Sequence, residues 1–208
     1  MKKIAILGSG GFAKEVLFLI EEIGGYDIVA FVDVEEKESL VIAGKSYQVI
    51  SEKQLSELGN QVNLTIGIGD PKLIRKLADK FKGDFTFPNL VHPSVIGNFK
   101  DIILGEGNII TASCIFTTSI TIGSFNVFNL GVTVGHDAII GDCNVLNPMV
   151  NISGGVKIGN SNLIGVNATI LQYKNVGNNS IVGAASLVTK NVDNDVTVVG
   201  VPAIKITK

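Results

Sequence analysis

Cysteine and histidine are scarce in this sequence, and both scarcities narrow the kinds of site that it can hold. The two cysteines, Cys114 and Cys143, are too few for a disulfide framework and lack the spacing of a metal site. We expect both to be small apolar core residues in a reduced, cytoplasmic protein. The two histidines, His92 and His136, lie far apart in the chain and cannot form a three-histidine zinc site within it, so no metal site is predicted.

Clustered charge and long apolar runs are also missing. Charged residues make up 17% of the chain, the net charge is −2 and the basic residues are scattered, so no nucleic-acid surface is expected. No run reaches the roughly 18 apolar residues of a membrane span. The start, MKKIAILGSGGF, superficially resembles a signal peptide, but its apolar run ends in a glycine loop before an amphipathic helix. We therefore expect a buried strand there.

A six-residue repeat fills the second half of the chain. Every sixth residue from Leu104 to Val188 is apolar, which predicts a parallel β-helix. Three hexapeptides make one triangular coil, so equivalent residues of successive coils stack at about the spacing of neighbouring strands, 4.8 Å. Val134 and Ile152 should then be inward neighbours on successive coils.

Glycine and asparagine recur between these apolar positions. Glycine often follows the apolar residue directly, and asparagine is frequent nearby, as at Gly105, Gly123, Gly135, Gly141, Gly159, Gly165, Gly177, Gly183, Asn126, Asn129, Asn144, Asn147, Asn160 and Asn162. Left-handed backbone costs glycine little and is tolerated by asparagine. We expect these residues to form the tight corners of the triangle.

Residues 1–92 lack the repeat and alternate between strand and helix patterns. The predicted strands cover residues 3–8, 27–33 and 61–70, a glycine turn and a helix together cover 8–24, and further helices cover 51–58 and 71–81. Residues 34–39 form a polar loop, and 85–97 are extended. This order predicts a small Rossmann-like α/β domain with three or four parallel strands. We place the β-helix and its C-terminal tail at residues 93–208.

Glycine turns follow two of the predicted strands. Gly10 and Gly11 lie between a strand and a helix, where backbone N–H groups can hold a phosphate, and Asp33 ends the next strand, where a ribose hydroxyl would lie. Gly69 follows a third strand at the same sheet edge. The alternatives are purely structural turns, with Asp70 as a helix cap.

His136 is the candidate catalytic residue. It follows Val134 by two positions and should face outward at a corner, and imidazole is the side chain best suited to accept a proton at neutral pH. Asp137 could orient it or be a solvated carboxylate. Gly154 stands at the equivalent position of the next coil, so its amide could stabilise an oxyanion beside the histidine. Because no serine or cysteine is tied to His136 by sequence, we expect direct transfer without a covalent intermediate.

Several motifs together resemble a known family. GSGGFAKEV, FVD, GIGD, HPSVIG, VGHDAIIGD, SGGVKIG, GVNATI, VGAASLVTKNV and VVGVPA are similar, over nearly the whole chain, to the sugar O-/N-acyltransferases of the sialic acid O-acetyltransferase type, which include bacillosamine and perosamine acetyltransferases. The resemblance implies a left-handed β-helix, a homotrimer, and acetyl-CoA bound in the groove between neighbouring β-helices. The acceptor would be a sugar or nucleotide-sugar.

The resemblance also assigns roles to residues. His136 matches the general base and Asp137 its acidic partner. The acetyl-CoA contacts fall at Gly154, Val166 and Ala184, and the acceptor contacts at Gly10, Gly11, Phe12, Asp33 and Gly69. Phe12 stands where histidine is common, Phe128–Asn129 where many members have His-Ile-Asn, and Val145 where some have a second active-site histidine.

Three other functions stay open at the level of sequence. The chain could O-acetylate free sialic acid, or it could be a non-catalytic trimeric scaffold that binds a nucleotide. The glycine loop also allows an NAD-linked enzyme, although the N-terminal domain is short for a dinucleotide fold. Whether nitrogen or oxygen is acylated, and on which sugar, is not determined.

Overall fold

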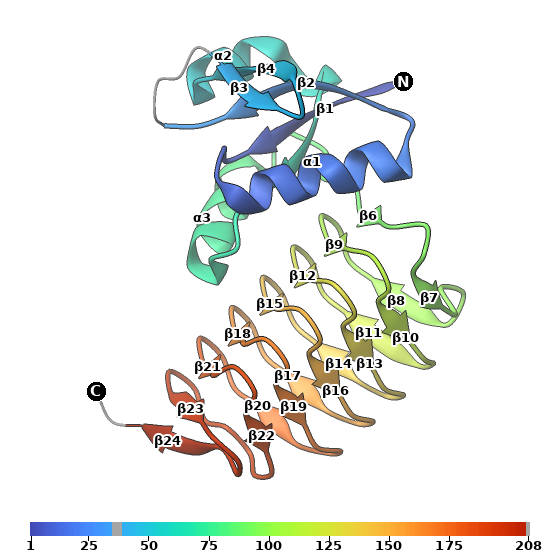
Figure 1. Cartoon of the computed structure of the whole chain (residues 1–208), viewed down its shortest axis with the longest axis vertical. Coiled ribbons are helices and arrows are strands. Elements are labelled where there is room, and N and C mark those ends of the chain that lie inside the picture. The colour runs from blue at the N-terminus through green and yellow to red at the C-terminus, as the bar shows by residue number, and fades with distance from the viewer. Residues whose placement is uncertain (35–38, 207–208) are drawn as a thin grey trace.

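The computed structural model describes residues 1–34 and 39–206, and it consists of a small α/β domain seated on a long β-helix (Figure 1). The predicted polar loop at 34–39 lies largely outside the described residues. The elements of the α/β domain are β1 (Lys2–Leu7), α1 (Gly11–Ile23), β2 (Tyr26–Val32), β3 (Ser39–Ile42), β4 (Lys45–Ile50), α2 (Glu52–Leu58), a 3₁₀ turn (Gly59–Gln61), β5 (Asn63–Ile66) and α3 (Pro71–Phe81).

The sheet of this domain has the order β3-β4-β2-β1-β5. Strands β4, β2, β1 and β5 are parallel, as predicted, whereas β3 runs antiparallel to β4. The β3–β4 hairpin was not predicted, because residues 39–50 mix apolar with polar residues. Helix α1 ends at Gly24 and α2 begins with a capping box between Ser51 and Gln54, which satisfies N–H groups at the helix start.

The β-helix begins at residue 90 and is left-handed. Its strands are β6 (Leu90–Val91), β7 (Ile96–Gly97), β8 (Ile102–Leu104), β9 (Ile109–Ile110), β10 (Ile115–Phe116), β11 (Ile120–Ile122), β12 (Val127–Phe128), β13 (Thr133–Val134), β14 (Ile139–Ile140), β15 (Val145–Leu146), β16 (Asn151–Ile152), β17 (Lys157–Ile158), β18 (Leu163–Ile164), β19 (Thr169–Ile170), β20 (Asn175–Val176), β21 (Ile181–Val182), β22 (Leu187–Val188), β23 (Thr197–Val199) and β24 (Ile204–Ile206). They form three sheets, one for each side of the prism.

We call the sheet of β6, β9, β12, β15, β18, β21, β23 and β24 the first face. The second face consists of β7, β10, β13, β16, β19 and β22, and the third face of β8, β11, β14, β17 and β20. The predicted stacking is confirmed, since Val134 pairs with Ile152 and Ile170 with Val188, each pair one coil of three hexapeptides apart. The inward apolar side chains form one continuous core. The final coil is shorter, because Ile181 pairs with Thr197, two positions short of a full coil.

The prediction that the glycines and asparagines named above adopt the left-handed backbone of the corners was wrong. Left-handed φ recurs at every sixth position, but it falls three positions after each inward apolar residue, at Gly107, Ser113, Ser119, Phe125, Gly131, Asp137, Cys143, Met149, Gly155, Ser161, Asn167, Tyr173, Asn179 and Ala185. The cost of left-handed backbone at non-glycine residues, about 1–2 kcal/mol each, is offset by the stacked coils that hold it.

The glycines directly after the inward residues serve close packing instead. A methyl group at Gly141 would lie 2.7 Å from the carbonyl oxygen of Gly159 on the next coil, and one at Gly159 would lie 2.7 Å from that of Gly177. These positions therefore need glycine for space between coils, not for its conformational freedom.

Asn126, Asn144 and Asn162 form a buried ladder along one corner, which we call the asparagine edge, between the third and first faces. The Nδ2 of Asn144 donates to Oδ1 of Asn126 at 3.0 Å, and its own Oδ1 accepts from Asn162 in the same way. These side chains are fully buried. They pair polar groups inside the corner, so their role is hydrogen bonding and not left-handed backbone.

The α/β domain packs on the first face of the β-helix. Val127 and Val145 point outward from that face yet are buried in the core of the α/β domain. Phe87 and Phe125 stack edge to face with ring centroids 5.1 Å apart, and Arg75 of α3 lies 3.8 Å from Asp142. Strand β6 already pairs with β9 of the β-helix. The apolar contact between the two parts fixes which corner lies near which edge of the small domain.

Candidate active site

His136 lies at the corner between the second and third faces, which we call the histidine edge. Strand β13 ends at Val134, Gly135 donates to the Ile152 carbonyl at 2.8 Å, and the chain turns outward. The His136 side chain is about half exposed, and its Nδ1 lies 2.7 Å from Oδ2 of Asp137. Because a carboxylate only accepts, this contact places a proton on Nδ1, so Nε2 is the acceptor of the neutral ring. Asp137 owes its position to its left-handed backbone, at φ 58°.

Gly154 stacks directly beyond the histidine, as its spacing predicts. A methyl group at Gly154 would lie 2.4 Å from Nε2 of His136, so the ring covers this glycine. The carbonyl of His136 accepts from the N–H of Gly155 at 2.7 Å. The free imidazole nitrogen and the backbone of Gly154 thus form one small outward-facing site, where a proton acceptor and an amide donor lie together.

The predicted backbone contacts at Val166 and Ala184 lie on a different corner. They stack one coil apart at the corner between the first and second faces, where Val166 is 42% exposed and Ala184 is exposed. The second face of the prism lies between this corner and the corner that carries Gly154. The structure therefore does not bring these two residues together with Gly154 within one chain.

The N–H groups of Gly154, Val166 and Ala184 share one property with other amides of the same two corners, among them those of Ala112, His136 and Gln172. Among the hydrogen bonds of residues 1–34 and 39–206, none of the three donates to a protein acceptor. At the equivalent positions of the asparagine edge, the N–H of Asp142 donates to Asn160 at 2.7 Å, on the next coil. Partly exposed, unpaired amides are available to a ligand's carbonyl groups.

The predicted acceptor residues meet at one edge of the small domain. Strands β1, β2 and β5 are neighbours, so the turns after Leu7, Val32 and Ile66 lie side by side. The turns also pack closely, because a methyl group at Gly67 would lie 2.7 Å from Ile6 and 2.8 Å from Ala13. Gly10, Gly11, Asp33 and Gly69 all follow these strands and are at least partly exposed.

Helix α1 presents free N–H groups at this edge. Gly10 is its N-cap, no side chain caps it, and its first turn carries no acidic residue. Uncapped N–H groups and the helix dipole favour an anion at this position. Phe12 does not extend into solvent, since its half-buried ring packs on the core of the small domain.

Asp33 is held by a residue that the sequence analysis missed. The Ser9 hydroxyl donates to one carboxylate oxygen of Asp33, and the N–H of Val34 donates to the other at 2.7 Å. A small polar residue in the glycine loop was the available signal. Asp70 accepts from the N–H groups of Lys72 and Leu73 at 2.8 and 3.0 Å. The prediction that Asp70 caps the following helix is therefore confirmed.

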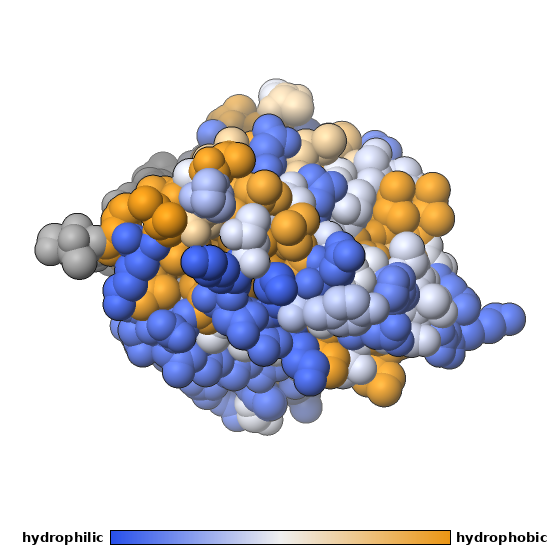
Figure 2. All heavy atoms as spheres, turned by 90° about the horizontal axis from the view of Figure 1, so that it is seen from below, coloured by the Kyte–Doolittle hydropathy of each residue, from blue (hydrophilic) through white to orange (hydrophobic). Residues whose placement is uncertain are grey.

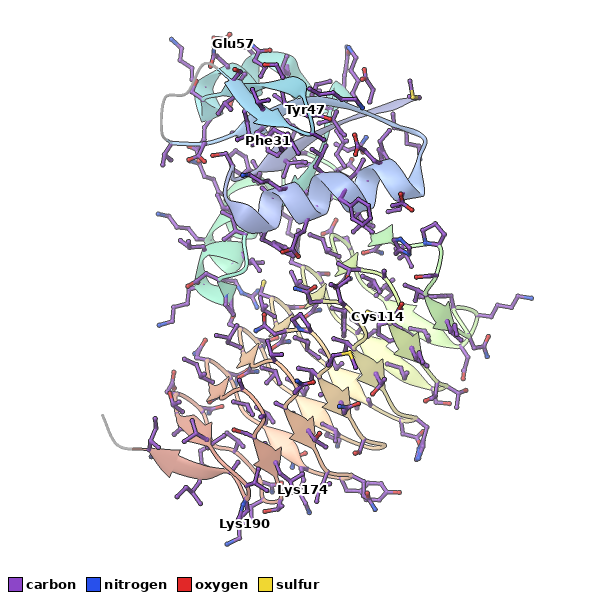
Figure 3. The ribbon with its side chains drawn as sticks, viewed as in Figure 1. Phe31, Tyr47, Glu57, Cys114, Lys174 and Lys190 are labelled. Atoms are coloured by element: carbon purple, nitrogen blue, oxygen red, sulfur yellow. The ribbon has the colours of Figure 1, made fainter. Side chains whose placement is uncertain are left out.

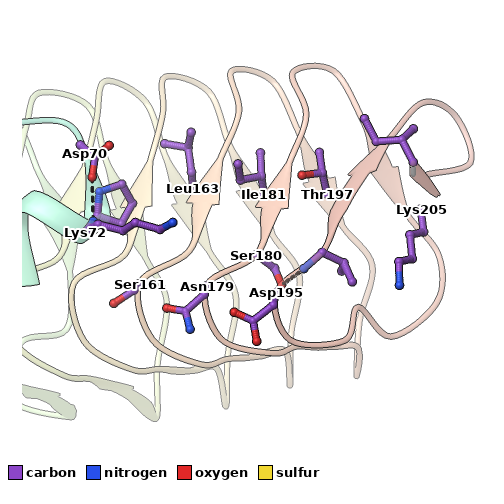
Figure 4. A pocket seen from close by; sticks show the side chains of 13 residues that line it. Asp70, Lys72, Ser161, Leu163, Asn179, Ser180, Ile181, Asp195, Thr197 and Lys205 are labelled. Carbon is purple, nitrogen blue, oxygen red and sulfur yellow. Dashed lines mark hydrogen bonds between the residues drawn. The ribbon is translucent and has the colours of Figure 1, made fainter. Parts of the chain in front are cut away.

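A cavity of about 860 Å³ lies away from His136, between the start of α3 and the last coils (Figure 4). Its walls are Pro71 and Lys72 of α3, the outward residues Leu163, Ile181 and Thr197 of the first face, and Ser161, Asn179 and Asp195 at the corner. None of the predicted site residues lines it, although Asp70, which does, directly follows Gly69. The candidate site at His136 and Gly154 therefore lies apart from this larger hollow.

Both cysteines are buried and free, as expected for core residues. Burial raises the pKa of Cys114 and of Cys143 to about 11, so both thiols are protonated near neutral pH. A protonated buried thiol is a poor nucleophile, which agrees with transfer without a covalent intermediate. Among the described residues, no helix is long and apolar enough to cross a membrane.

The fold and this site define a class: hexapeptide-repeat proteins in which a Rossmann-like domain precedes a left-handed β-helix. Residues 3–81 match the family model of the PglD N-terminal domain. A UDP-N-acetylbacillosamine N-acetyltransferase of Bacillus subtilis is 31% identical over 116 residues, which is 54% of this chain. The aligned region spans about half, 52%, of that relative's length.

Solved structures extend the similarity to the whole chain. A variant of perosamine N-acetyltransferase from Caulobacter crescentus, in complex with CoA and GDP-perosamine, has a TM-score of 0.90 at 29% identity and covers 99% of this chain and 97% of its own. The acetyltransferase domain of PglB from Neisseria gonorrhoeae, in complex with acetyl coenzyme A, has a TM-score of 0.91 at 25% identity, with 99% of each chain covered. Over nearly its whole length the chain is thus similar in structure to sugar N-acetyltransferases, and its residues 3–81 match the PglD N-terminal domain.

Proposed function

We propose that this protein transfers the acetyl group of acetyl-CoA to the amino group of a nucleotide-linked sugar. The observation that carries the proposal is the pairing of His136 and Gly154, which places the Nε2 acceptor beside a backbone N–H that donates to no acceptor within the described part of the chain. Support for an amine acceptor comes from the Bacillus subtilis and Caulobacter crescentus relatives, which are named as N-acetyltransferases. Support for acetyl-CoA comes from the solved structures, one with CoA and GDP-perosamine and one with acetyl coenzyme A.

In the proposed mechanism the acceptor nitrogen attacks the thioester carbonyl carbon. His136 takes the proton that the nitrogen loses, and the Gly154 N–H donates to the oxygen as it becomes negative. Asp137 holds the ring through Nδ1 and stabilises the imidazolium. The tetrahedral intermediate then expels the CoA thiolate, which receives the proton from His136, and the products are the sugar acetamide and CoA.

We propose that residues 1–92 hold the acceptor and residues 93–208 hold acetyl-CoA, in a protein of the cytoplasm. The acceptor would place its phosphates at the uncapped start of α1, with its ribose at Asp33 and Gly69 alongside. Gly154, Val166 and Ala184 would each donate a backbone N–H to the acetyl-CoA arm.

These assignments require more than one copy of the chain. The small domain covers the first face, whereas His136 lies at the opposite corner, between the second and third faces. Gly154 and Val166 are likewise on different corners. We propose a homotrimer in which the histidine edge of one copy faces the corner with Val166 and Ala184 on the next.

The corner that carries Val166 and Ala184, between the first and second faces, has the composition of an interface. Leu130, Met149 and Val166 are 47%, 53% and 42% exposed, and Ile115 on the adjoining second face is 40% exposed. We call these residues the apolar edge. Viewed from the C-terminal end, the surface likewise shows patches of apolar side chains among polar ones (Figure 2). Contiguous exposed apolar residues favour association.

We expect Met149→Glu to convert the trimer into monomers, because three carboxylates would enter an apolar contact. Light scattering should show the mass fall from three times 21.9 kDa to 21.9 kDa. Turnover should fall with it, since each acetyl-CoA site loses one wall. Val41→Glu, at a 65% exposed valine of the β3–β4 hairpin, is the matched control and should remain trimeric. A monomeric wild type, or an unchanged variant, would overturn the trimer.

The function itself is tested by thiol release from acetyl-CoA in the presence of UDP-, GDP- and dTDP-linked amino sugars and of free sialic acid. We expect release with at least one nucleotide-linked amino sugar. Release with sialic acid alone would replace the proposal by O-acetylation. Binding of acetyl-CoA without release from any acceptor would favour the non-catalytic scaffold, and tight NAD binding by calorimetry would favour the dinucleotide enzyme.

A further inference from the structure

Backbone hydrogen bonds connect the successive coils at each corner of the β-helix. Along each corner, N–H groups of residues with left-handed backbone donate to carbonyls on the preceding coil, and we call each such series an amide chain. On the histidine edge, the N–H of Asp137 donates to the Thr118 carbonyl at 3.2 Å. The His136 carbonyl in turn accepts from the N–H of Gly155 at 2.7 Å. The peptide that joins His136 to Asp137 is therefore held on both sides.

The three amide chains start on different acceptors. The chain of the asparagine edge starts on the Phe87 carbonyl, and the chain between the first and second faces starts on the Ser94 hydroxyl. The chain of the histidine edge starts on a carboxylate, because the N–H of Ser119 donates to Oδ2 of Asp101 at 2.8 Å. Of these three amide chains, the one that carries the candidate base is thus the one that begins at a charged group.

The same oxygen of Asp101 accepts two further hydrogen bonds, from the hydroxyl of Thr118 and from the hydroxyl of Ser119 at 3.2 Å. The Thr118 hydrogen bond is the largest cause of a lowered pKa of Asp101, so this carboxyl is ionised near neutral pH. Ser119 needs support from a neighbour, because its backbone is left-handed, at φ 55°. The carboxylate therefore fixes the peptide between Thr118 and Ser119, and the carbonyl of that peptide is the one that holds Asp137.

The direction of the amide chain suits a carboxylate at its start. All its N–H groups point toward Asp101 and its carbonyls point toward the C-terminal coils. Aligned peptides are stabilised by an anion at the N–H end and by cations at the carbonyl end, as in a helix. Lys174 and Lys190 lie at the C-terminal end of the β-helix (Figure 3). Hydrogen bonds in series also polarise one another, so the acceptor at the start affects the later members.

We propose that Asp101 is a positioning residue for the transfer reaction, which holds the His136–Asp137 peptide in place through the corner of the intervening coil. This inference rests on the proposed acetyltransferase function. Asp101 lies two coils before Asp137, about 10 Å at the spacing of neighbouring strands, and the imidazole extends the other way, over Gly154. Asp101 therefore acts through the backbone and not by contact with the ring.

The test compares Asp101→Ala with Asp101→Asn. Because all three hydrogen bonds go to one oxygen, the Oδ1 of an asparagine can accept them without the charge. We expect kcat to fall about 10-fold in Asp101→Ala, with KM for acetyl-CoA within about twofold, since a small displacement of a catalytic group lowers turnover. Asp101→Asn should recover kcat to within about threefold of the wild type.

Ser94→Ala is the matched control, because it removes the side-chain oxygen that starts the amide chain of the neighbouring corner. Its kcat should stay within about twofold of the wild type, since that chain does not hold His136.

Amide hydrogen exchange supplies a readout that does not depend on activity. The N–H of Asp137 should exchange about 10-fold faster in Asp101→Ala and at the wild-type rate in Asp101→Asn, because the corner opens locally once its first acceptor is lost. The N–H of Met149, which donates to the Leu130 carbonyl at 2.8 Å on the neighbouring corner, should exchange at the wild-type rate in both variants.

A wild-type kcat in Asp101→Ala would overturn the proposal. So would an Asp101→Asn variant as slow as Asp101→Ala, because the charge and not the position would then matter. An equal loss in Ser94→Ala would mean that these acceptors support the fold alone. If the wild type transfers no acetyl group, the proposed function fails, and the exchange of the Asp137 N–H still decides whether Asp101 holds this corner.

Discussion

Replacing His136 with alanine should lower kcat by about 10²–10⁴-fold, the range expected for loss of a general base. The reason is local: Nδ1 is held by Asp137 at 2.7 Å, and Nε2, which covers Gly154, is the nitrogen left to take a proton. The dissociation constant for acetyl-CoA should stay within about twofold, because the variant keeps the backbone amide of Gly154. Steady-state kinetics and calorimetry on the same preparation check both halves of this prediction.

His92→Ala is the matched control for this experiment. His92 is partly exposed and its Nδ1 lies 2.7 Å from the Ser94 hydroxyl and accepts from the Ser94 N–H at 3.0 Å, at the start of the β-helix. Its loss should leave kcat within about twofold of the wild type. Near-full activity of His136→Ala would remove the base from the mechanism. A loss of acetyl-CoA binding in that variant would point to a binding role instead.

Replacing Asn144 with leucine should destabilise the protein by roughly 2–6 kcal/mol, because each buried polar group that loses its partner costs about 1–3 kcal/mol. The substitution leaves the N–H of Asn162 without its acceptor and the Gly159 carbonyl without its side-chain donor inside the asparagine edge, while the side-chain amide of Asn162 keeps its bond to the Gly177 carbonyl. Whole proteins are stable by only about 5–15 kcal/mol, so the effect is large. Urea unfolding followed by circular dichroism at one protein concentration measures it.

Asn160→Ala provides the comparison on the same edge. Asn160 is exposed and accepts from the N–H of Asp142 at 2.7 Å, so water can replace its side chain. The variant should lose less than about 1 kcal/mol. Equal losses at the two positions would mean that the buried ladder contributes no more than a surface hydrogen bond.

The periodic half of the chain was the most predictable part. A six-residue repeat of inward apolar side chains admits one stacking register, because a shift by one residue would turn these side chains outward. The same register put Gly154 beside His136, and the structure has both in that arrangement. The α/β pattern was predictable for β1, α1, β2, β5 and α3, where buried runs and glycine stops are clear.

Other features of the structure could not be predicted from the sequence. Left-handed corners at Phe125, Cys143 and Tyr173 contradict local preference and exist because stacked coils impose the turn. The asparagines of the buried ladder were predicted to form tight corners with left-handed backbone, because a sequence does not show whether an amide faces solvent or another amide. The β3–β4 hairpin was missed for lack of a buried alternating pattern, and Ser9 was identified only once its hydroxyl was seen on Asp33.

The sequence by itself determined the two architectures, one from alternating strand and helix patterns and the other from a fixed period of six. The same period determined that His136 faces outward and that Gly154 is its neighbour one coil away. Only the tertiary structure decided where the small domain sits. Its apolar underside covers Val127 and Val145 on the first face, and this leaves the proposed acceptor edge of the small domain and His136 on different sides of one chain. That packing depends on contacts between residues far apart in sequence, which no local pattern records. It is also the reason that the proposed site needs a second copy.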